Sequence, residues 1–195
     1  MSIRVLARSA LLAGVALASA AAASADVFMK VEGTPGEARQ RGFEGQVVLS
    51  GATINISSFV TPDPEGIADN VRTVSAGSLF LTKMLDRSSP KLMMSAVEGA
   101  PLGTIEISFT SPNPNGVGQT VDAKWIIEGA EVRSYNAFPD AANANMQSEQ
   151  IEVAYASMRY QYFTKDAKGQ RTGGMEEVKW KVPEGQLFPF DEGCH

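Results

Sequence analysis

The sequence has few of the residues on which common catalytic and cross-linking chemistry depends. Its 195 residues include one cysteine, Cys194, and one histidine, His195. A single cysteine cannot form a disulfide within the chain, so the core alone must stabilise the fold. A Ser-His-Asp triad needs a histidine inside the fold, and a structural zinc site usually has four protein ligands. We therefore expect no cofactor, no metal and no catalytic residue, and predict that the protein is not an enzyme.

The sequence also lacks an apolar run long enough to anchor it in a membrane. The apolar stretch near the N-terminus, Ala10–Ala18, is short and rich in alanine, whereas a spanning helix needs about twenty strongly apolar residues. Two arginines flank its start, and the small residues Ala-Ser-Ala at 23–25 follow it, as in a secretory signal peptide. We predict cleavage between Ala25 and Asp26.

Cleavage at this bond divides the chain into a signal peptide, residues 1–25, and one domain, residues 26–195, which is long enough to bury a core. Loss of the two arginines takes the formal net charge from −5 to −7. An acidic surface repels phosphate groups, so we expect no binding of nucleic acid. We expect a periplasmic or secreted protein that does not insert into a membrane after cleavage.

Alternation of apolar and polar residues predicts β-strands along most of the mature chain. The clearest strand is 104–110, TIEISFT, with three large apolar side chains on one face. The pattern also predicts strands at 27–31, 47–49, 54–56 and 125–132, with a tight turn at Ser50-Gly51 and a bend at Gly129. In the long strand 149–164 the alternation changes phase at Ala156-Ser157, which indicates a bulge. A final strand, 175–182, forms a hairpin with it through a loop that contains Gly169, Gly173 and Gly174.

Three segments rich in proline, glycine, aspartate and asparagine predict irregular loops: Ser57–Gly77, Ser111–Gln119 and Asn136–Gln147. The sequence therefore predicts a mainly β fold with seven to nine strands and one short helix. Such a pattern favours an antiparallel β-barrel or sandwich.

The single predicted helix lies in the segment Ser78–Gly99. Ser88 and Ser89 are candidates to cap free backbone N–H groups, and Pro90 suits the first helical position because it needs no donor there. Gly99 ends the helix. At helical spacing we expect one apolar face to join the core, formed by Leu92, Met93, Ala96 and Val97.

The stretch LTKMLDRSSPKLMM in this segment resembles the pattern T-K-x-x-D-x-x-S-P-x-L-M of the haemolysin-coregulated proteins (Hcp) of type VI secretion systems. Four further stretches are similar to family patterns in the same order: DVFMKVEGTPGEA, KWIIEGAEVRSY, EQIEVAYASMRYQY and GGMEEVKWKV. The resemblance covers roughly 150 residues, which is most of the mature chain.

The resemblance implies a β-barrel of two packed sheets with one flanking α-helix. It also implies a structural or carrier protein that forms homo-oligomeric, hexameric rings, with secretion spike or sheath proteins and small effector cargo as partners. Tube-building members of the family are assembled in the cytoplasm and carry no signal peptide, so the predicted export is a departure. The alternative function is a small exported binding module, enzyme or effector that reuses the Hcp-like barrel.

Overall fold

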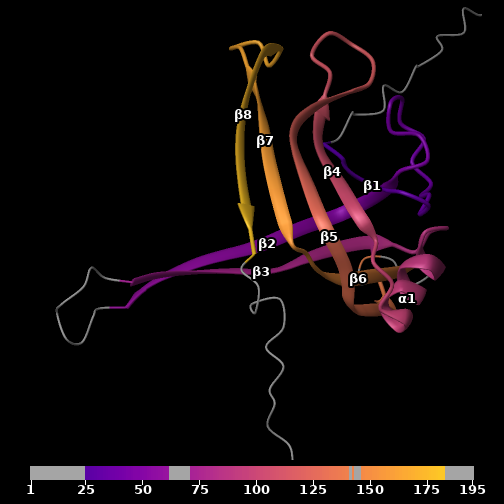
Figure 1. Cartoon of the computed structure of the whole chain (residues 1–195). Coiled ribbons are helices and arrows are strands. Elements are labelled where there is room, and N and C mark those ends of the chain that lie inside the picture. The colour runs from indigo at the N-terminus through magenta and orange to yellow at the C-terminus, as the bar shows by residue number, and fades with distance from the viewer. Residues whose placement is uncertain (1–24, 62–70, 141, 143–145, 183–195) are drawn as a thin grey trace, which may run out of the picture.

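The computed structural model describes residues 25–61, 71–140, 142 and 146–182, and most of the predicted signal peptide, residues 1–24, lies outside them. The described residues form eight β-strands and one α-helix (Figure 1). In chain order these are β1 (Val27–Val31), β2 (Val47–Thr61), β3 (Val71–Met84), α1 (Ser89–Glu98), β4 (Gly103–Pro112), β5 (Gln119–Pro139), β6 (Gln147–Ala154), β7 (Ser157–Lys165) and β8 (Arg171–Lys181).

Six of these strands close on one another as a barrel. The antiparallel order β4-β1-β2-β3-β6-β5 is completed by a pairing of β5 with β4. Strands β7 and β8 continue the sheet beyond this cycle, because β7 pairs with β5 and β8 pairs with β7. The fold is thus the mainly β, antiparallel barrel with one short helix that the sequence predicts.

The longest strand, β5, joins the two parts of the sheet because it changes partner along its length. One edge pairs with β4, while the other pairs first with β7, at 123–128, and then with β6, at 131–139. The change occurs at Gly129, whose φ of 64° lies in the left-handed region that favours glycine. The bend expected at this glycine is confirmed.

The barrel interior is filled by alternate residues of its strands. Members of this core that are 0 % exposed include Met29, Val47, Leu79, Ile105, Ile107, Ile127, Ile151 and Val153. A smaller cluster lies under the segment that leads from β1 to β2, where the rings of Phe28 and Phe43 stack with centroids 4.3 Å apart. Each strand of the closed barrel contributes one face to the core, as the alternating pattern predicts.

All three predicted loops are wrong in part. Residues 57–61 and 71–77 lie in β2 and β3, so the expected loop Ser57–Gly77 is a long hairpin whose residues 62–70 lie outside the described part of the chain. The expected turn at Ser50-Gly51 is also wrong, since β2 runs through it with a register shift. In the second loop, Ser111 and Pro112 belong to β4 and Gln119 begins β5. In the third loop, residues up to Pro139 belong to β5. The single long strand 149–164 with a bulge at Ala156-Ser157 is also wrong, because the chain there forms two separate strands, β6 and β7.

The helix has the predicted length, but its buried face is turned from the expected one. Leu92 is 1 % exposed and Ala96 packs on the core, whereas Met93 is 46 % exposed and Val97 is 74 % exposed. The expectation that Met93 belongs to the core is therefore wrong. Successive helical residues are about 100° apart, so burial of Leu92 turns Met93 outward. Ser95 completes the buried stripe because its hydroxyl donates to the Lys91 carbonyl, 3.0 Å away.

Candidate functional site

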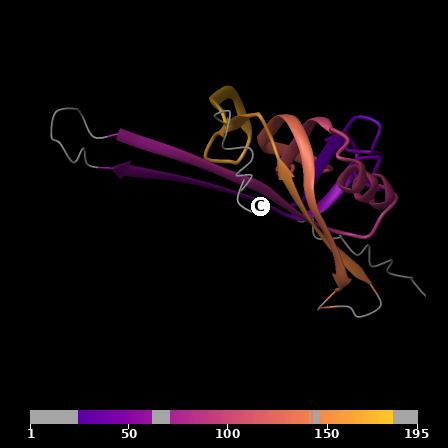
Figure 2. The same ribbon diagram turned by 60° about the horizontal axis from the view of Figure 1, so that its bottom comes forward.

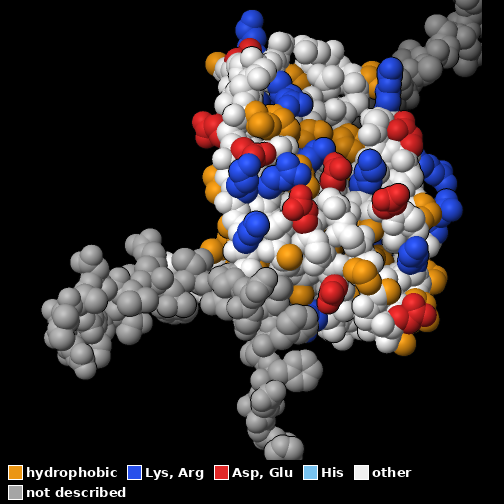
Figure 3. All heavy atoms as spheres, viewed as in Figure 1, with side chains coloured by type: hydrophobic (Ala, Val, Ile, Leu, Met, Phe, Trp, Pro, Cys, Tyr) orange, Lys and Arg blue, Asp and Glu red, His pale blue; other side chains and the backbone are white. Residues whose placement is uncertain are grey.

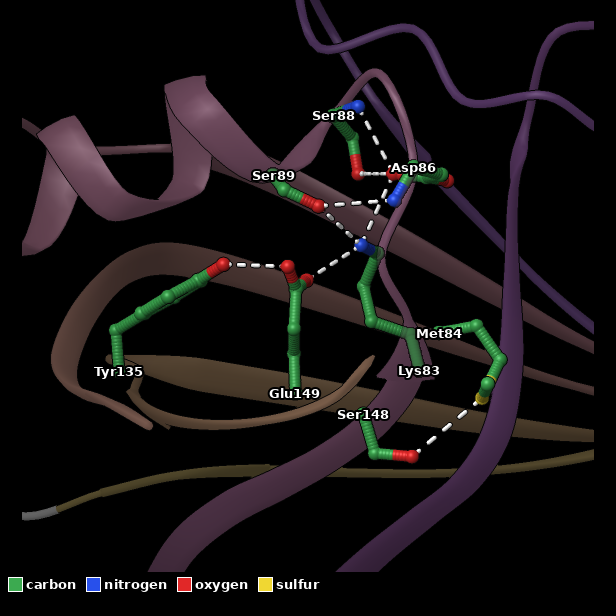
Figure 4. A network of polar contacts seen from close by, with 8 residues as sticks. All are labelled: Lys83, Met84, Asp86, Ser88, Ser89, Tyr135, Ser148 and Glu149. Atoms are coloured by element: carbon green, nitrogen blue, oxygen red, sulfur yellow. Dashed lines mark hydrogen bonds and ion pairs between the residues drawn. The ribbon is translucent and has the colours of Figure 1, made fainter. Parts of the chain in front are cut away.

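A buried charged network joins strands β3 and β6 to the start of the helix (Figure 4). At its centre lies Lys83, which is 0 % exposed and pairs with the equally buried Glu149, with 2.6 Å between Nζ and Oε2. The ammonium also donates to Ser89 Oγ at 2.9 Å and forms an ion pair with Asp86 Oδ1 at 2.9 Å. Three partners match the three N–H groups of the lysine, so the buried charge is fully compensated.

The other carboxylate oxygen of Glu149 is satisfied by a second strand. The Tyr135 hydroxyl, on β5, donates to Glu149 Oε1 across 2.6 Å. Burial of the Tyr135 phenol raises its pKa well above the usual range, and the hydrogen bond to the Glu149 carboxylate is the second cause of this rise. The phenol therefore stays protonated and acts as a fixed donor.

Asp86 holds the helix entrance, where the sequence led us to expect serine caps. Ser88 lies at the N-cap and makes no side-chain capping bond to the helix. Its backbone N–H donates to Asp86 Oδ1 at 2.9 Å, and its hydroxyl donates to the same oxygen. Ser89 Oγ accepts from the Asp86 backbone N–H at 3.0 Å. Pro90 lies in the first helical turn, and Gly99 ends the helix with a φ of 65°.

The network brings together residues that lie within the family-like patterns of the sequence. Lys83, Asp86, Ser89 and Pro90 are four of the five fixed positions of T-K-x-x-D-x-x-S-P, and Glu149 opens the stretch EQIEVAYASMRYQY. Sequence reasoning assigned no role to Lys83 or Glu149. The Lys83 ammonium joins Glu149, on β6, to Asp86 and Ser89 at the start of the helix, so the arrangement fixes the helix on the barrel.

The predicted cleavage site lies at the edge of the described fold. Ala25 is exposed, whereas Asp26 is tied to the barrel. The Asp26 carbonyl accepts from the backbone N–H and the hydroxyl of Thr110, at 3.0 and 2.8 Å, and its carboxylate accepts from the Gln119 side chain at 3.0 Å.

The hairpin of β2 and β3 extends away from the barrel in both ribbon views (Figures 1 and 2). We define its outer part, residues 56–61 and 71–76, as the arm. The two strands of the arm pair with each other from Ile56 and Ala76 to Thr61 and Val71. In the described residues neither strand of the arm has a second strand partner, and Ile56 is 49 % exposed.

The face of the molecule seen in Figure 3 carries side chains of both charge signs, interspersed, together with some hydrophobic side chains. Lys124 pairs with Glu106 at 3.0 Å, and this hydrogen bond is the main cause of a lowered Glu106 pKa.

Among the described residues no group of three or more His, Cys, Asp or Glu side chains could hold a metal ion. In the same residues no helix is long and apolar enough to span a membrane.

Comparison with known protein families identifies the fold. The model of the family described as "Type VI secretion system effector, Hcp" matches residues 28–162, which include seven of the eight strands in whole or in large part. The chain belongs to the Hcp family. A search of curated protein sequences finds no match.

Solved structures of Hcp proteins share the fold. A type VI secretion system protein superposes with a TM-score of 0.72 at 20 % identity, covering 82 % of this chain and 96 % of that chain. Hcp1 from Salmonella typhimurium gives 0.65 at 16 % identity, covering 82 % and 95 %. A double variant of Hcp1 from the E. coli EAEC 042 pathovar gives 0.61 at 18 % identity, covering 82 % and 99 %. At these identities the likeness establishes the architecture alone.

Proposed function

We propose that this Hcp-family chain is a non-catalytic structural or carrier protein that assembles with copies of itself into hexameric rings. The partners that follow from the family are secretion spike or sheath proteins and small effector cargo. We further propose that the chain is exported by its signal peptide and acts in the periplasm or outside the cell.

The observation that carries the ring proposal is the arm. A two-stranded hairpin is marginally stable in water unless it packs against something else. The arm has no further strand beside it in the described part of the chain and exposes half of Ile56. A surface on another copy of the chain would supply the missing contact. A head-to-tail contact of this kind generates a closed ring when the rotation between subunits closes.

Cleavage between Ala25 and Asp26 is supported by the contacts of Asp26. The carbonyl and carboxylate of Asp26 bond to Thr110 and Gln119, so the cut removes nothing that these bonds need. The mass of the protein recovered from the periplasm should correspond to a chain that begins at Asp26. Recovery of the uncleaved chain from that compartment would contradict the proposed processing.

Shortening the arm tests the ring directly. We expect the exported protein at about 10 µM to have the mass of a hexamer by light scattering, and a variant in which an Asn-Gly turn replaces residues 56–76 to be about six-fold smaller. The barrel strands remain in this variant, so its circular dichroism should still be that of a folded β protein, reduced only by the deleted arm. Val97→Ser, on the exposed side of the helix, is the matched control and should leave the hexamer intact.

The two possible failures of this experiment have different meanings. A strictly monomeric parent protein would refute the ring. A shortened variant that still forms the ring would refute the role of the arm and leave the ring in place.

A further inference from the structure

A pocket lies beside helix α1, on the flank of the barrel, between the helix and the segments that follow β1 and precede β4 (Figure 1). Its volume of about 560 Å³ is within the range of small-molecule sites. No residue of the Lys83 network lines it, so it is a separate feature of the helix. The side chains that give it its chemistry are Glu32 and Thr34 after β1, Lys91, Met94 and Glu98 on the helix, and Leu102 before β4.

The two charged residues that the helix contributes to the pocket oppose the helix dipole. Lys91 lies in the first turn, and Glu98 is the last residue of the helix. The N-terminus of a helix carries a partial positive charge and the C-terminus a partial negative one, so each side chain is unfavourable where it stands. No acidic residue in the first turn and no basic residue in the last offsets them. A local conflict of this kind is expected where residues serve a site rather than stability.

The charges of the pocket are not neutralised by one another. Among the described residues neither Glu32, Lys91 nor Glu98 forms an ion pair. The Lys91 ammonium lies close to the backbone of Gly33, because a Cβ on this glycine would be 3.3 Å from Nζ. The ammonium and Thr34, the next residue in the chain, are therefore at the same end of the pocket.

Thr34 adds a polar group that is buried without a partner. The residue is 2 % exposed, and its hydroxyl forms no hydrogen bond within the described chain. A buried hydroxyl in this state is costly, and so calls for an explanation. No bond fixes its rotamer, so rotation about the Cα–Cβ bond can turn the hydroxyl toward the pocket. A hydroxyl and an ammonium are both donors, and together they suit a carboxylate.

The other end of the pocket suits an ammonium group. Glu98 follows Lys91 by two helical turns, which is about 10 Å along the axis, and three residues of extended peptide span about the same length. Between these ends, Met94 and Leu102 offer apolar surface. With Glu32 the pocket has two carboxylates and one ammonium, so it repels a simple anion such as phosphate.

From this arrangement we propose that the pocket binds a short peptide of about three residues with free amino and carboxyl ends. The carboxylate of the peptide is bound by Lys91 and Thr34, its ammonium is bound by Glu98, and an apolar side chain between them packs on Met94 and Leu102. The site lies within one chain, so it needs no ring.

Calorimetric titration of the exported protein with the tripeptide Ala-Leu-Ala tests the proposal. We expect a Kd on the order of 100 µM, as is usual for a ligand of this size. Lys91→Met and Glu98→Gln should each weaken binding about tenfold, and Thr34→Val about threefold. Lys168→Met, in the loop between β7 and β8, is the matched control and should bind as the parent protein does. Circular dichroism reports whether each variant is folded.

Blocked peptides show which end of the ligand meets which side chain. Amidation of the peptide carboxylate should weaken binding to the parent protein about tenfold and leave binding to Lys91→Met unchanged. Acetylation of the amino end should have the same relation to Glu98→Gln. A merely structural role of Lys91 or Glu98 would not give this pairing, because each variant would respond to both blocked peptides as the parent does.

Three results would overturn the proposal. The first is the absence of binding at 10 mM peptide, roughly one hundred times the expected Kd. The second is equal affinity of the parent protein for the free and the blocked peptides. The third is a Lys91→Met variant that binds as tightly as Lys168→Met.

Discussion

Replacing Lys83 with methionine is expected to lower the free energy of unfolding by about 3–5 kcal/mol, because it leaves Glu149 as a buried charge without its cation. Both side chains are 0 % exposed, so water cannot take the place of the lysine. The same change removes the ammonium from Asp86 and Ser89 and so loosens the start of the helix. Urea denaturation of the variant and the parent protein measures the difference.

Two further variants separate the network from a general effect of losing a lysine. Lys124→Met breaks the surface pair with Glu106, whose side chains are 29 % and 37 % exposed, and should cost at most about 1 kcal/mol. Adding Glu149→Leu to Lys83→Met removes the unpaired charge and should regain a large part of the lost stability. If Lys83→Met were no more damaging than Lys124→Met, the network would not be what fixes the helix.

The position of this network could be predicted only in part from the sequence. Leu79, Leu81 and Lys83 share one phase of alternation, as do Glu149, Ile151 and Val153, so the phase places both charges inside the barrel. That they meet depends on the pairing of β3 with β6, across 66 positions of the chain. Local patterns carry no information on such a pairing. The segment could thus be recognised as a helix start, while its main support could not.

The arm and the helix face show two other limits of sequence patterns. The prolines and acidic residues between 62 and 70 led us to predict one loop for Ser57–Gly77, although β-branched residues flank them on both sides. On the helix, the spacing of the apolar residues fits either of two adjacent faces, one that includes Met93 and Val97 and one that includes Ser95. Burial of Ser95, whose hydroxyl is satisfied within the helix, decides between them, and apolar periodicity does not count a serine.

The bend at Gly129 was predictable from the sequence. The backbone there packs closely against Ala156, and a substitution of this glycine is expected to have the second large effect on stability. We expect Gly129→Ala to lower the free energy of unfolding by about 2–4 kcal/mol, from the left-handed backbone and from overpacking together. A Cβ at this position would lie 2.8 Å from the Cβ of Ala156, which is closer than two carbon atoms approach. Ala156 cannot retreat freely, since its backbone N–H donates to the Glu128 carbonyl at 2.9 Å. Urea denaturation measures the loss.

The two contributions at Gly129 can be separated by matched variants. Gly103 has a φ of 73° and no atom near its would-be Cβ, so Gly103→Ala carries the backbone strain alone, about 1–2 kcal/mol. Adding Ala156→Gly to Gly129→Ala removes the clash and should bring the loss down toward the same value. If Gly129→Ala and Gly103→Ala lowered the free energy of unfolding equally, a Cβ at position 129 would fit at the bend without a clash. A larger loss at Gly129, relieved by Ala156→Gly, would mean that close backbone packing there directs β5 from β7 to β6 and so closes the barrel.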